Sequence, residues 1–565
     1  MPPGITRVGR ECVGVTFGDF VFHERLREVT ELIKEQNDEV DASDDPYVTV
    51  AHIAEQSVTD PDDPSLAGAQ GELLGLAYQQ REHNEQRDAG RPAIKLLIGN
   101  AGEGWEHSLI TAEEIVERAE DENLGMDRPI AAVGFGHSVV NNSRAIQRVG
   151  EAALTMVGTT ATFDDVARFG AREHSEFYFP VAPPNSRIAT QAAHWARHGV
   201  PWTDPEGEEH GLPGHETAVA IASAETDTKG EEHEKYGPHL AREFMEAFVE
   251  AEGGEVWQGA EGLGSDEYDE QGVLLYQSGH LETDTTYREH LDRLCSDENP
   301  PDLLYYAGRS DDFTRFYRDF MRSGGEECNG GGMTILGGDD ISKFVSDSEV
   351  LIERNSVHHP VFYTPLAPSG PWGVQGDGSG GSDQGFYDDM GELLTELYTK
   401  DEDGKGDGDE EEGESGMPPA DELPSIAHAA VGNDALLVIA NALPSTGLTK
   451  EESANEGLRQ RLGLARMPFL HTEEDYEEKR DALHGQVKTS GTFTGVSGYI
   501  TFEAANDGNW FGGRMVHLVL VGPRVRNDET GDVQRQHVLQ RCGMRNSTTV
   551  EPGAGCLPVK TDEEP

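Results

Sequence analysis

Three hydroxyl side chains are candidates for binding an anion, because they lie at predicted helix starts or at the end of a predicted strand. They are Ser138, Thr160 and Thr162. Ser138 directly precedes a helix predicted to begin near Val139, and Thr162 precedes FDDVA, the predicted start of another helix. The first N–H groups of a helix carry the positive end of its dipole, so hydroxyls and anions are favoured there. Thr160 ends the strand-like run LTMVGTT, so its backbone can face a cleft. The alternative is that Ser138 and Thr162 only cap helices, the commoner use of such residues.

The acidic and histidine-containing stretches do not match a metal site. Residues 401–412, DEDGKGDGDEEE, echo the ligand positions of a twelve-residue calcium loop. However, Lys405 stands where an oxygen ligand is expected, and the following GESGMPP is unsuited to an exiting helix. We therefore interpret this run as a solvated acidic loop. Other candidate metal ligands are His210, His215 and Glu216 in EEHGLPGHE, and the adjacent pair His358 and His359. Their spacing fits no helical metal motif, so we interpret them as ordinary loop residues without a metal.

Known catalytic motifs are incomplete in this chain. Ser138 in GHSVV lacks the glycine that completes a nucleophile elbow, and no Asp and His partners are assignable to it. GFGHSV lacks the third glycine of a dinucleotide-binding fingerprint. The sequence therefore predicts a binding protein with no enzymatic activity, no cofactor and no metal.

Two successive series of strands and helices are predicted to position these residues. The first contains the strand-like runs CVGVTFGDFVF, YVTVAHIAEQSV, AIKLLIGNAG, IAAVGFGH and LTMVGTT, separated by amphipathic stretches. The pattern restarts at TAVAIASAET and continues through EVWQGAEG, DLLYYAGR, MTILGGDD and VFYTPLAP. Such alternation is typical of βαβ units and a parallel sheet. We therefore predict an α/β protein of two doubly wound parallel-sheet lobes, joined by hinge crossover strands, with a cleft lined by the carboxyl ends of strands.

Composition and pattern divide the chain into six predicted parts. Residues 369–425 are rich in Gly, Asp and Glu around one short helix, FYDDMGELLTELYT, which is typical of an inserted, mobile, acidic loop. The other parts follow from the series of strands and helices: an N-terminal lobe at 11–183, a C-terminal lobe at 184–365, a helical return to the N-terminal lobe at 426–490, final strands of the C-terminal lobe at 491–540 and a tail at 541–565.

The chain is strongly acidic. It has 565 residues, of which 106 are Asp or Glu and 44 are Lys or Arg, giving a formal net charge of −62. A field of this sign repels nucleic acids and anionic lipid, so neither is a predicted partner. An acidic surface with few lysines is also what a protein working in high salt shows, because a Debye length of ~3 Å at 1 M salt removes the self-repulsion.

The five cysteines bear on the compartment of the protein. Cys295 and Cys328 each end a helical stretch beside a strand-like one, and Cys542 and Cys556 bracket a short loop. Two disulfides, with Cys12 left over, would fit an oxidising compartment. Scattered free thiols are the alternative, because pairing cannot be read from a sequence. No signal peptide or transmembrane run is recognisable after the opening MPPGITRVGR, which leaves the route of export open.

Six stretches in register resemble the type I periplasmic-binding fold, and most closely its leucine/isoleucine/valine-binding branch. They are VGFGHSVVNNSRAIQ with LTMVGTTAT, FYFPVAPPN, EKYGPHLAREF, LLYYAGRSDDF, ILGGDD and VSGYITFEAANDGN, and they span roughly residues 11 to 520 in the family's order. The ECVGVT opening is similar to that of large actinobacterial proteins of this kind, in which a membrane anchor precedes it. The resemblance implies two hinged lobes that close on a small ligand without catalysis.

The resemblance also implies the residues of an amino-acid site. Ser138, Thr160 and Thr162 occupy or adjoin the positions that hold the ligand's carboxylate in this family. Tyr236 in KYG falls on the aromatic residue that closes over the ligand, and Asp339 in GGDD falls where a carboxylate receives the ammonium group. An ordinary core tyrosine and an ordinary cap or turn aspartate are the structural alternatives.

Arg309, in YYAGRS, is the main departure from the branched-chain binders, which keep an aromatic residue there. An arginine suits a second carboxylate or a phosphate on the ligand. The sequence therefore predicts a solute-binding protein for an ABC importer, with an amino acid or related zwitterion as ligand and a membrane permease as partner. A sensing or interaction module of the same fold, with a signalling partner, is the alternative. The resemblance implies an extracytoplasmic or cell-surface location, and a cytoplasmic one stays open.

Overall fold

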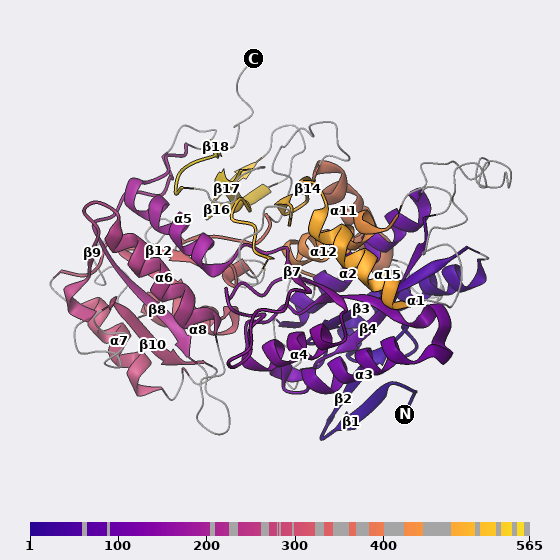
Figure 1. Ribbon diagram of the computed structural model, residues 1–565. Coiled ribbons are helices and arrows are strands. Elements are labelled where there is room, and N and C mark those ends of the chain that lie inside the picture. Colours follow the sequence, from indigo (N-terminus) through magenta and orange to yellow (C-terminus); the bar gives the residue numbers. More distant parts are fainter. Residues whose placement is uncertain are drawn as a thin grey trace, which may run out of the picture.

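Two α/β lobes lie side by side in the computed structural model (Figure 1). Each is built on its own sheet, and the helices cover the faces of these sheets. The structure describes residues 1–43, 45–58, 65–87, 91–203, 209–224, 235–260, 271–278, 281, 284–296, 299–322, 333–342, 361–368, 383–399, 423–444, 476–502, 509–526, 533–544 and 551–558.

The N-terminal lobe contains a seven-stranded sheet of order β1-β2-β4-β3-β5-β6-β7. Five of these strands run parallel, and the first of the five along the chain, β3, lies between β4 and β5. This is the predicted doubly wound arrangement, with apolar strands buried on both faces. The strands are β1 (Ile5–Val8), β2 (Glu11–Thr16), β3 (Tyr47–Ala54), β4 (Ala93–Asn100), β5 (Pro129–Gly134), β6 (Thr155–Gly158) and β7 (Tyr178–Pro180).

Strand β2 departs from the predicted parallel series. It runs antiparallel to β4, on the side away from β3, and it forms a hairpin with β1. The two-residue turn begins at Gly9, whose φ of 58° suits the turns that match the twist of a hairpin. The sheet therefore starts before the predicted boundary at residue 11, and the first βαβ unit begins at β3.

The helices of the N-terminal lobe come from both halves of the chain. Helix α12 packs along α2, and the approach is close, since a Cβ on Gly75 of α2 would lie 1.9 Å from the Ala429 carbonyl oxygen. The helices are α1 (Arg27–Ala42), α2 (Ser65–Gln86), α3 (Ser108–Glu120), α4 (Val140–Glu151), α11 (Asp383–Thr399), α12 (Ile426–Ala442) and α15 (Tyr476–Thr489). Short 3-10 turns are η1 (Glu24–Leu26), η2 (Glu103–Trp105), η3 (Glu122–Asp127) and, in the other lobe, η4 (Gln258–Ala260).

Helix α11, which lies within the predicted insertion, is part of the core. Phe386 packs edge-on against Tyr78 of α2 with ring centroids 5.3 Å apart, and the Tyr78 hydroxyl donates to Asp389. The acidic stretches on either side of α11, including the calcium-like residues 401–412, lie outside the described residues.

The C-terminal lobe contains a nine-stranded sheet of order β10-β8-β11-β12-β13-β16-β17-β18, with β9 also paired to β8. The first five strands repeat the parallel, doubly wound order of the other lobe, and the last three are antiparallel. The strands are β8 (Thr217–Ala224), β9 (Glu255–Val256), β10 (Val273–Gln277), β11 (Leu303–Ala307), β12 (Thr334–Gly337), β13 (Val361–Tyr363), β16 (Val516–Arg526), β17 (Val533–Cys542) and β18 (Cys556–Pro558). The helices are α5 (Asn185–His198), α6 (Tyr236–Glu250), α7 (Thr285–Ser296) and α8 (Ser310–Arg322).

Three predictions for the C-terminal lobe need correction. The second parallel strand is β10, whereas the predicted strand EVWQGAEG contributes only the two paired residues of β9. Strand β18 lies in the predicted tail but pairs with β17, to which the Cys542–Cys556 disulfide joins it. The hairpin of β14 (Phe493–Gly495) and β15 (Gly498–Ile500) forms a separate two-stranded sheet and does not join the C-terminal sheet.

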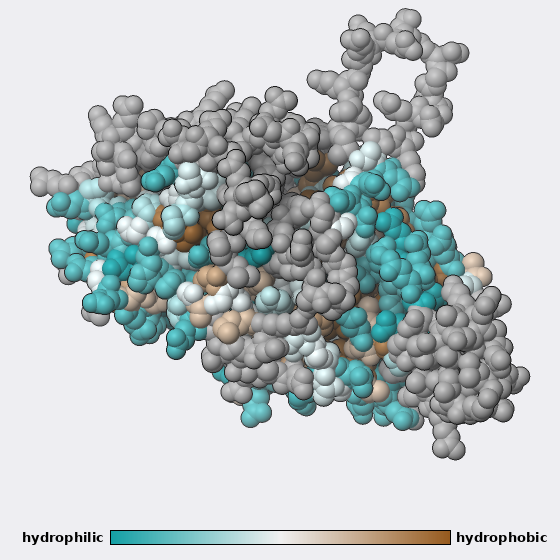
Figure 2. Space-filling model, turned by 90° about the horizontal axis from the view of Figure 1, so that it is seen from above, coloured by the Kyte–Doolittle hydropathy of each residue, from teal (hydrophilic) through white to brown (hydrophobic). Residues whose placement is uncertain are grey.

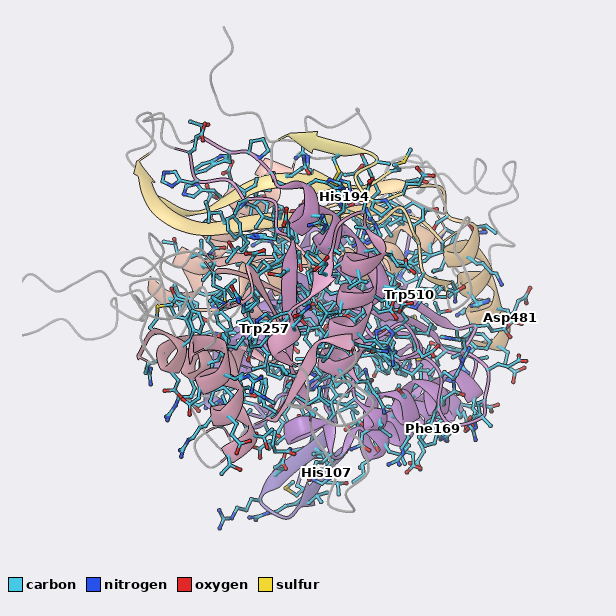
Figure 3. All side chains as sticks on the ribbon, turned by 90° about the vertical axis from the view of Figure 1, so that its left-hand side faces the viewer. His107, Phe169, His194, Trp257, Asp481 and Trp510 are labelled. Atoms are coloured by element: carbon cyan, nitrogen blue, oxygen red, sulfur yellow. A yellow bond between two sulfur atoms is a disulfide. The ribbon has the colours of Figure 1, made fainter. Side chains whose placement is uncertain are left out.

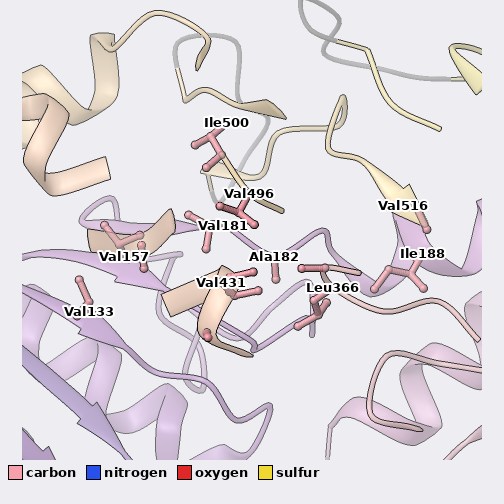
Figure 4. Close-up of a cluster of buried hydrophobic side chains, with 14 of the residues drawn as sticks. Val133, Val157, Val181, Ala182, Ile188, Leu366, Val431, Val496, Ile500 and Val516 are labelled. Carbon is pink, nitrogen blue, oxygen red and sulfur yellow. The ribbon is translucent and has the colours of Figure 1, made fainter. Parts of the chain in front are cut away.

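The chain passes between the lobes from β7 to α5, from β13 to α11 and from β15 to β16, and residues 369–382 and 503–508 of the last two passages lie outside the described part. Their apolar side chains meet in one buried group, which we name the hinge cluster (Figure 4). Its members come from the three crossings and from α12: Val181, Ala182, Leu366, Val431, Val496 and Ile500. The crossover strands that the sequence predicts therefore lie at FYFPVAPPN, VFYTPLAP and GVSGYITF, and they share one apolar core.

Polar hydrogen bonds complete the third crossing. Asp434 of α12 is fully buried and accepts the N–H groups of Val496 and Ser497, both at 2.8 Å. Arg514, just before β16, donates to the Ser497 hydroxyl at 2.7 Å. Trp510 (Figure 3) donates its indole N–H to the Asp164 carbonyl oxygen at 2.8 Å. The crossing is thereby fixed to the N-terminal lobe by groups whose burial makes their loss costly.

On the face seen in Figure 2, the described residues are mainly hydrophilic, with a few hydrophobic areas between them. Cys542 and Cys556 are disulfide-bonded and Cys12 is a free thiol, while Cys328 and the side chain of Cys295 lie outside the described part. None of the described helices is long and apolar enough to cross a membrane.

Candidate ligand-binding cavity between the lobes

A cavity of about 420 Å³ lies between the two lobes, where the carboxyl ends of both parallel sheets face each other. Crevices beyond the carboxyl ends of parallel strands are where doubly wound folds bind ligands. From the N-terminal lobe it is lined by residues that follow successive strands: Glu55 after β3, Glu103 and Trp105 after β4, Gly136, His137 and Ser138 after β5, and Thr160 after β6. From the C-terminal lobe it is lined by Ser278 after β10, Arg309 after β11, Asp339 and Asp340 after β12, and Tyr236 at the start of α6.

Five of the six predicted site residues line this cavity. Ser138 and Thr160 belong to the N-terminal lobe, and Tyr236, Arg309 and Asp339 belong to the C-terminal lobe. The sixth, Thr162, is fully buried behind it and is not part of its lining. Residues far apart in the sequence are thus brought together, and their contact with a ligand stays a prediction.

Ser138 holds two loops together through its hydroxyl oxygen. This oxygen accepts the N–H groups of Thr162 and Phe163, both at 3.1 Å. A serine hydroxyl has two acceptor lone pairs and one proton, so the proton is available to a third group. Helix α4 begins at Val140 with Val139 as its N-cap, so Ser138 does not cap it. The cap alternative is therefore excluded for Ser138, and its hydroxyl is a donor at the cavity wall.

The predicted helix after Thr162 is wrong. The segment 164–167 forms a turn, with the Val166 N–H bonded to the Phe163 carbonyl oxygen. The Thr162 N–H is used by Ser138, and its carbonyl oxygen accepts the Asn185 N–H at 2.7 Å. No helix dipole therefore points from Thr162 into the cavity, and the residue ties the Ser138 loop to the first crossing.

The Thr160 hydroxyl faces the cavity as an acceptor. It donates its proton to the Gly136 carbonyl oxygen at 2.7 Å. Its lone pairs are then the groups that it can offer to a bound molecule, and they suit an N–H donor. Thus, at the ends of the neighbouring strands β5 and β6, Ser138 offers a hydrogen-bond donor and Thr160 offers an acceptor.

Asp339 is the most unusual titratable group of the cavity. It is only 8% exposed, and its Oδ1 accepts no hydrogen bond from the described residues. Burial, followed by the like charge of Asp340, raises the pKa of Asp339 to about 7, against the opposing effects of the Tyr236 hydroxyl and Arg309. Burial also raises the pKa of Tyr236 well above its ordinary value. A buried carboxylate oxygen without a donor is a group that a bound molecule can satisfy.

Two side-chain contacts of Arg309 lie within the C-terminal lobe. Its guanidinium lies over the Tyr236 ring, 5.0 Å from the centroid, and its Nη1 is 4.0 Å from Asp340 Oδ2. The same Asp340 oxygen accepts the Ser310 N–H at 2.9 Å. These contacts fix Arg309 beside Tyr236 and Asp340 at the cavity wall, and its predicted role of binding a second carboxylate or a phosphate stays a prediction.

Sequence reasoning missed the acidic and aromatic lining of the N-terminal lobe. Glu55 accepts the Gly104 N–H at 2.8 Å, and its Oε2 lies 4.0 Å from His137 Nδ1. Glu72 of α2, which also lines the cavity, lies 2.9 Å from His52 Nε2. The signal was available for the Glu103–Trp105 turn, which directly follows the predicted run AIKLLIGNAG, whereas Glu55 was included in the predicted run YVTVAHIAEQSV, and β3 ends before it at Ala54.

The lobes touch at the rim of the cavity. The Lys235 N–H, just before α6, donates to the Ser138 carbonyl oxygen at 3.0 Å. His239 of α6 packs edge-on against Phe163 with ring centroids 5.0 Å apart, and its Nδ1 is 3.9 Å from Asp164. Both contacts join the C-terminal lobe to Ser138 or to the loop bonded to its hydroxyl. A substitution of Ser138 is therefore expected to alter the contact between the lobes.

The described histidine loop is not arranged as a metal site. Burial lowers the pKa of the His215 imidazole to about 4, and the backbone N–H of His215 donates to the Ala196 carbonyl oxygen. The Glu216 N–H donates to the carboxylate of Asp302. Within the described ranges, no group of three or more metal-ligating side chains is close enough to hold an ion, and His358 and His359 lie outside these ranges.

The fold is similar to solved structures of substrate-binding proteins. One is an ABC transporter substrate-binding protein from Desulfitobacterium hafniense in complex with Leu, with a TM-score of 0.50 and 16% identity over 86% of this chain and 99% of that one. A second is a branched-chain amino acid transporter substrate-binding protein from Streptococcus pneumoniae in complex with isoleucine (TM-score 0.50, 14% identity, 87% and 99% covered). A third is a possible leucine/isoleucine/valine-binding protein from Rhodopirellula baltica (TM-score 0.50, 12% identity, 88% and 97% covered). No protein-family model and no curated protein sequence matches the chain. At these identities the likeness establishes the fold alone.

Proposed function

We propose that this chain, which has the type I periplasmic-binding fold, is a solute-binding protein that closes two lobes on an amino acid or a similar zwitterion for an ABC importer. The observation that carries the proposal is the cavity between the carboxyl ends of the two sheets. Its polar groups come from opposite lobes, so that a ligand which contacts both also joins them.

The polarities of the cavity groups suit the two ends of an amino acid. The Ser138 hydroxyl, whose oxygen already accepts two N–H groups, donates its proton to the ligand's carboxylate. The Thr160 hydroxyl and Asp339 Oδ1 accept from the ammonium group. Tyr236, held under Arg309, covers the ligand from the C-terminal lobe.

Closure follows from these contacts. A ligand that touches Ser138 and Asp339 together interacts fully only with the closed arrangement, so it shifts the population toward that arrangement by its difference in affinity. The three crossings that share the hinge cluster are the segments about which the lobes rotate. A permease that recognises the closed form is the partner that this function needs.

An oxidising compartment outside the cytoplasm is the location that fits this function. The Cys542–Cys556 disulfide supports it, because such bonds persist in oxidising compartments and are rare in reducing ones. The structures with a similar fold that were solved with Leu and isoleucine support the importer role by analogy of fold.

Titration calorimetry of the full chain against the common amino acids tests the proposal. At least one is expected to bind, and Ser138→Ala and Asp339→Asn should each weaken it ten-fold or more, which is the loss of about 1.4 kcal/mol in a hydrogen bond to a charged group. Ser143→Ala is the matched control, because Ser143 is buried in α4 but does not line the cavity. Absence of binding, or binding that neither cavity variant weakens, would refute the proposal.

A further inference from the structure

Among the described residues that line the cavity, carboxylates outnumber cations. They are five acidic side chains against one guanidinium and two imidazoles. The acids are Glu55, Glu72, Glu103, Asp339 and Asp340, and the bases are Arg309, His137 and His428. Even with both imidazoles protonated, the acids outnumber the bases. A neutral ligand leaves the excess negative charge of the lining without a counter-charge, whereas a cationic ligand supplies one.

The acids differ in what they face. Glu72 is close to His52 and accepts the Thr159 hydroxyl at 3.0 Å, and Asp340 faces Arg309. Asp339 has a buried oxygen at the cavity that accepts no hydrogen bond from the described residues. That oxygen points to a bound donor independently of the charge count, and the ligand's α-ammonium group takes this place in the function proposed above.

Glu55, Glu103 and Trp105 line the cavity from the N-terminal lobe together with His137, whose Nδ1 lies 4.0 Å from Glu55 Oε2 and whose ring centroid lies 6.5 Å from that of Trp105. The Gly104 N–H donates to Glu55 Oε1, which fixes Glu55 beside the 103–105 turn. Trp105 is only 2% exposed and has a φ of 62°, a conformation that non-glycine residues rarely adopt and that persists where function requires it. Tryptophan rings and carboxylates both attract organic cations, and this part of the lining supplies both.

We propose, building on the solute-binding function, that the ligand is an amino acid whose side chain ends in a second cation, an ammonium or a guanidinium group. Glu55, Glu103 and Trp105 receive this second cation, while Ser138 and Asp339 hold the carboxylate and the α-ammonium group. The site therefore selects a ligand of net positive charge and disfavours the aliphatic amino acids.

Pairs of ligands that differ only in charge test this selectivity. L-arginine is compared with L-citrulline, and L-lysine with L-norleucine, by titration calorimetry of the full chain. At least one cationic member is expected to bind ten-fold or more tightly than its neutral partner. Glu103→Gln and Glu55→Gln should each reduce that ratio at least several-fold. Glu106→Gln is the matched control, because Glu106 is exposed in the same loop and does not line the cavity.

The outcomes separate this inference from the function on which it rests. If L-leucine or a neutral partner binds as tightly as the cationic amino acids, the second-cation site is refuted and solute binding stands. If both glutamine variants keep the arginine to citrulline ratio of the unaltered chain, the assignment to Glu55 and Glu103 is refuted. If no amino acid binds at all, both proposals fail. Thermal unfolding of each variant establishes that it is folded.

Discussion

Replacing Asp339 by asparagine is expected to change how stability depends on pH. Burial and Asp340 raise the pKa of Asp339 from its ordinary 3.8 to about 7. The folded state therefore keeps a proton that the unfolded state releases, and this contribution to stability is lost as the pH rises from about 4 to about 7. Of the interval from pH 5 to pH 8, only the part below the folded pKa of about 7 counts, because only there does the folded state hold a proton that the unfolded state lacks. About two pH units at about 1.36 kcal/mol per unit give about 3 kcal/mol. Asparagine does not titrate and escapes this loss.

Urea unfolding followed by circular dichroism at pH 5 and pH 8 measures the effect. The unfolding free energy of Asp339→Asn minus that of the unaltered chain is expected to rise by about 3 kcal/mol from pH 5 to pH 8. Titrations elsewhere cancel in this double difference. Asp340→Asn removes the like charge that contributes to the raised pKa of Asp339, so a smaller gain of the same sign is expected for it. A double difference below about 1 kcal/mol would refute the reasoning.

Three other perturbations test the hinge, the disulfide and the charge. Asp434→Ala is expected to lower the unfolding free energy by about 3–5 kcal/mol, because it leaves Arg514 without its buried counter-charge and the Ser497 N–H unpaired; a loss below about 1 kcal/mol in urea unfolding would contradict this. Cys542→Ser removes a disulfide of sequence separation 14 and should cost about 3 kcal/mol, which calorimetry with and without reductant checks; equal Tm values would count against it. Raising KCl from 0.1 M to 2 M should raise Tm, because screening relieves the repulsion of a net charge of −62, and a falling Tm would overturn this account.

The parallel core of each lobe was predictable because its strands are buried on both faces and read as short apolar runs between helices. The runs of β3, β5 and β12 are of this kind. Strand β2 has the same composition, yet it is antiparallel, because the Gly9 hairpin reverses the chain at the edge of the sheet. The apolar composition of a strand does not tell whether it runs parallel or antiparallel to its neighbour, so the turn before β2 was the informative feature.

The site was predictable where a residue follows a strand and not where it depends on local turn geometry. Arg309 and Asp339 stand at the ends of the predicted runs DLLYYAGR and MTILGGDD, just after β11 and β12, and both line the cavity. Thr162 was misplaced because FDDVA was given a helix that it does not form, and a single turn does not repay the cost of helix nucleation. Trp105 reaches the cavity through a backbone conformation that sequence patterns do not indicate.

A crystal structure of the chain grown with its tightest-binding amino acid is the most direct test of the central claim. The ligand is expected in the cavity between the lobes, with its carboxylate within about 3 Å of the Ser138 hydroxyl and its α-ammonium within about 3 Å of Asp339. Electron density for the ligand at any other place, with this cavity holding only water, would contradict the claim.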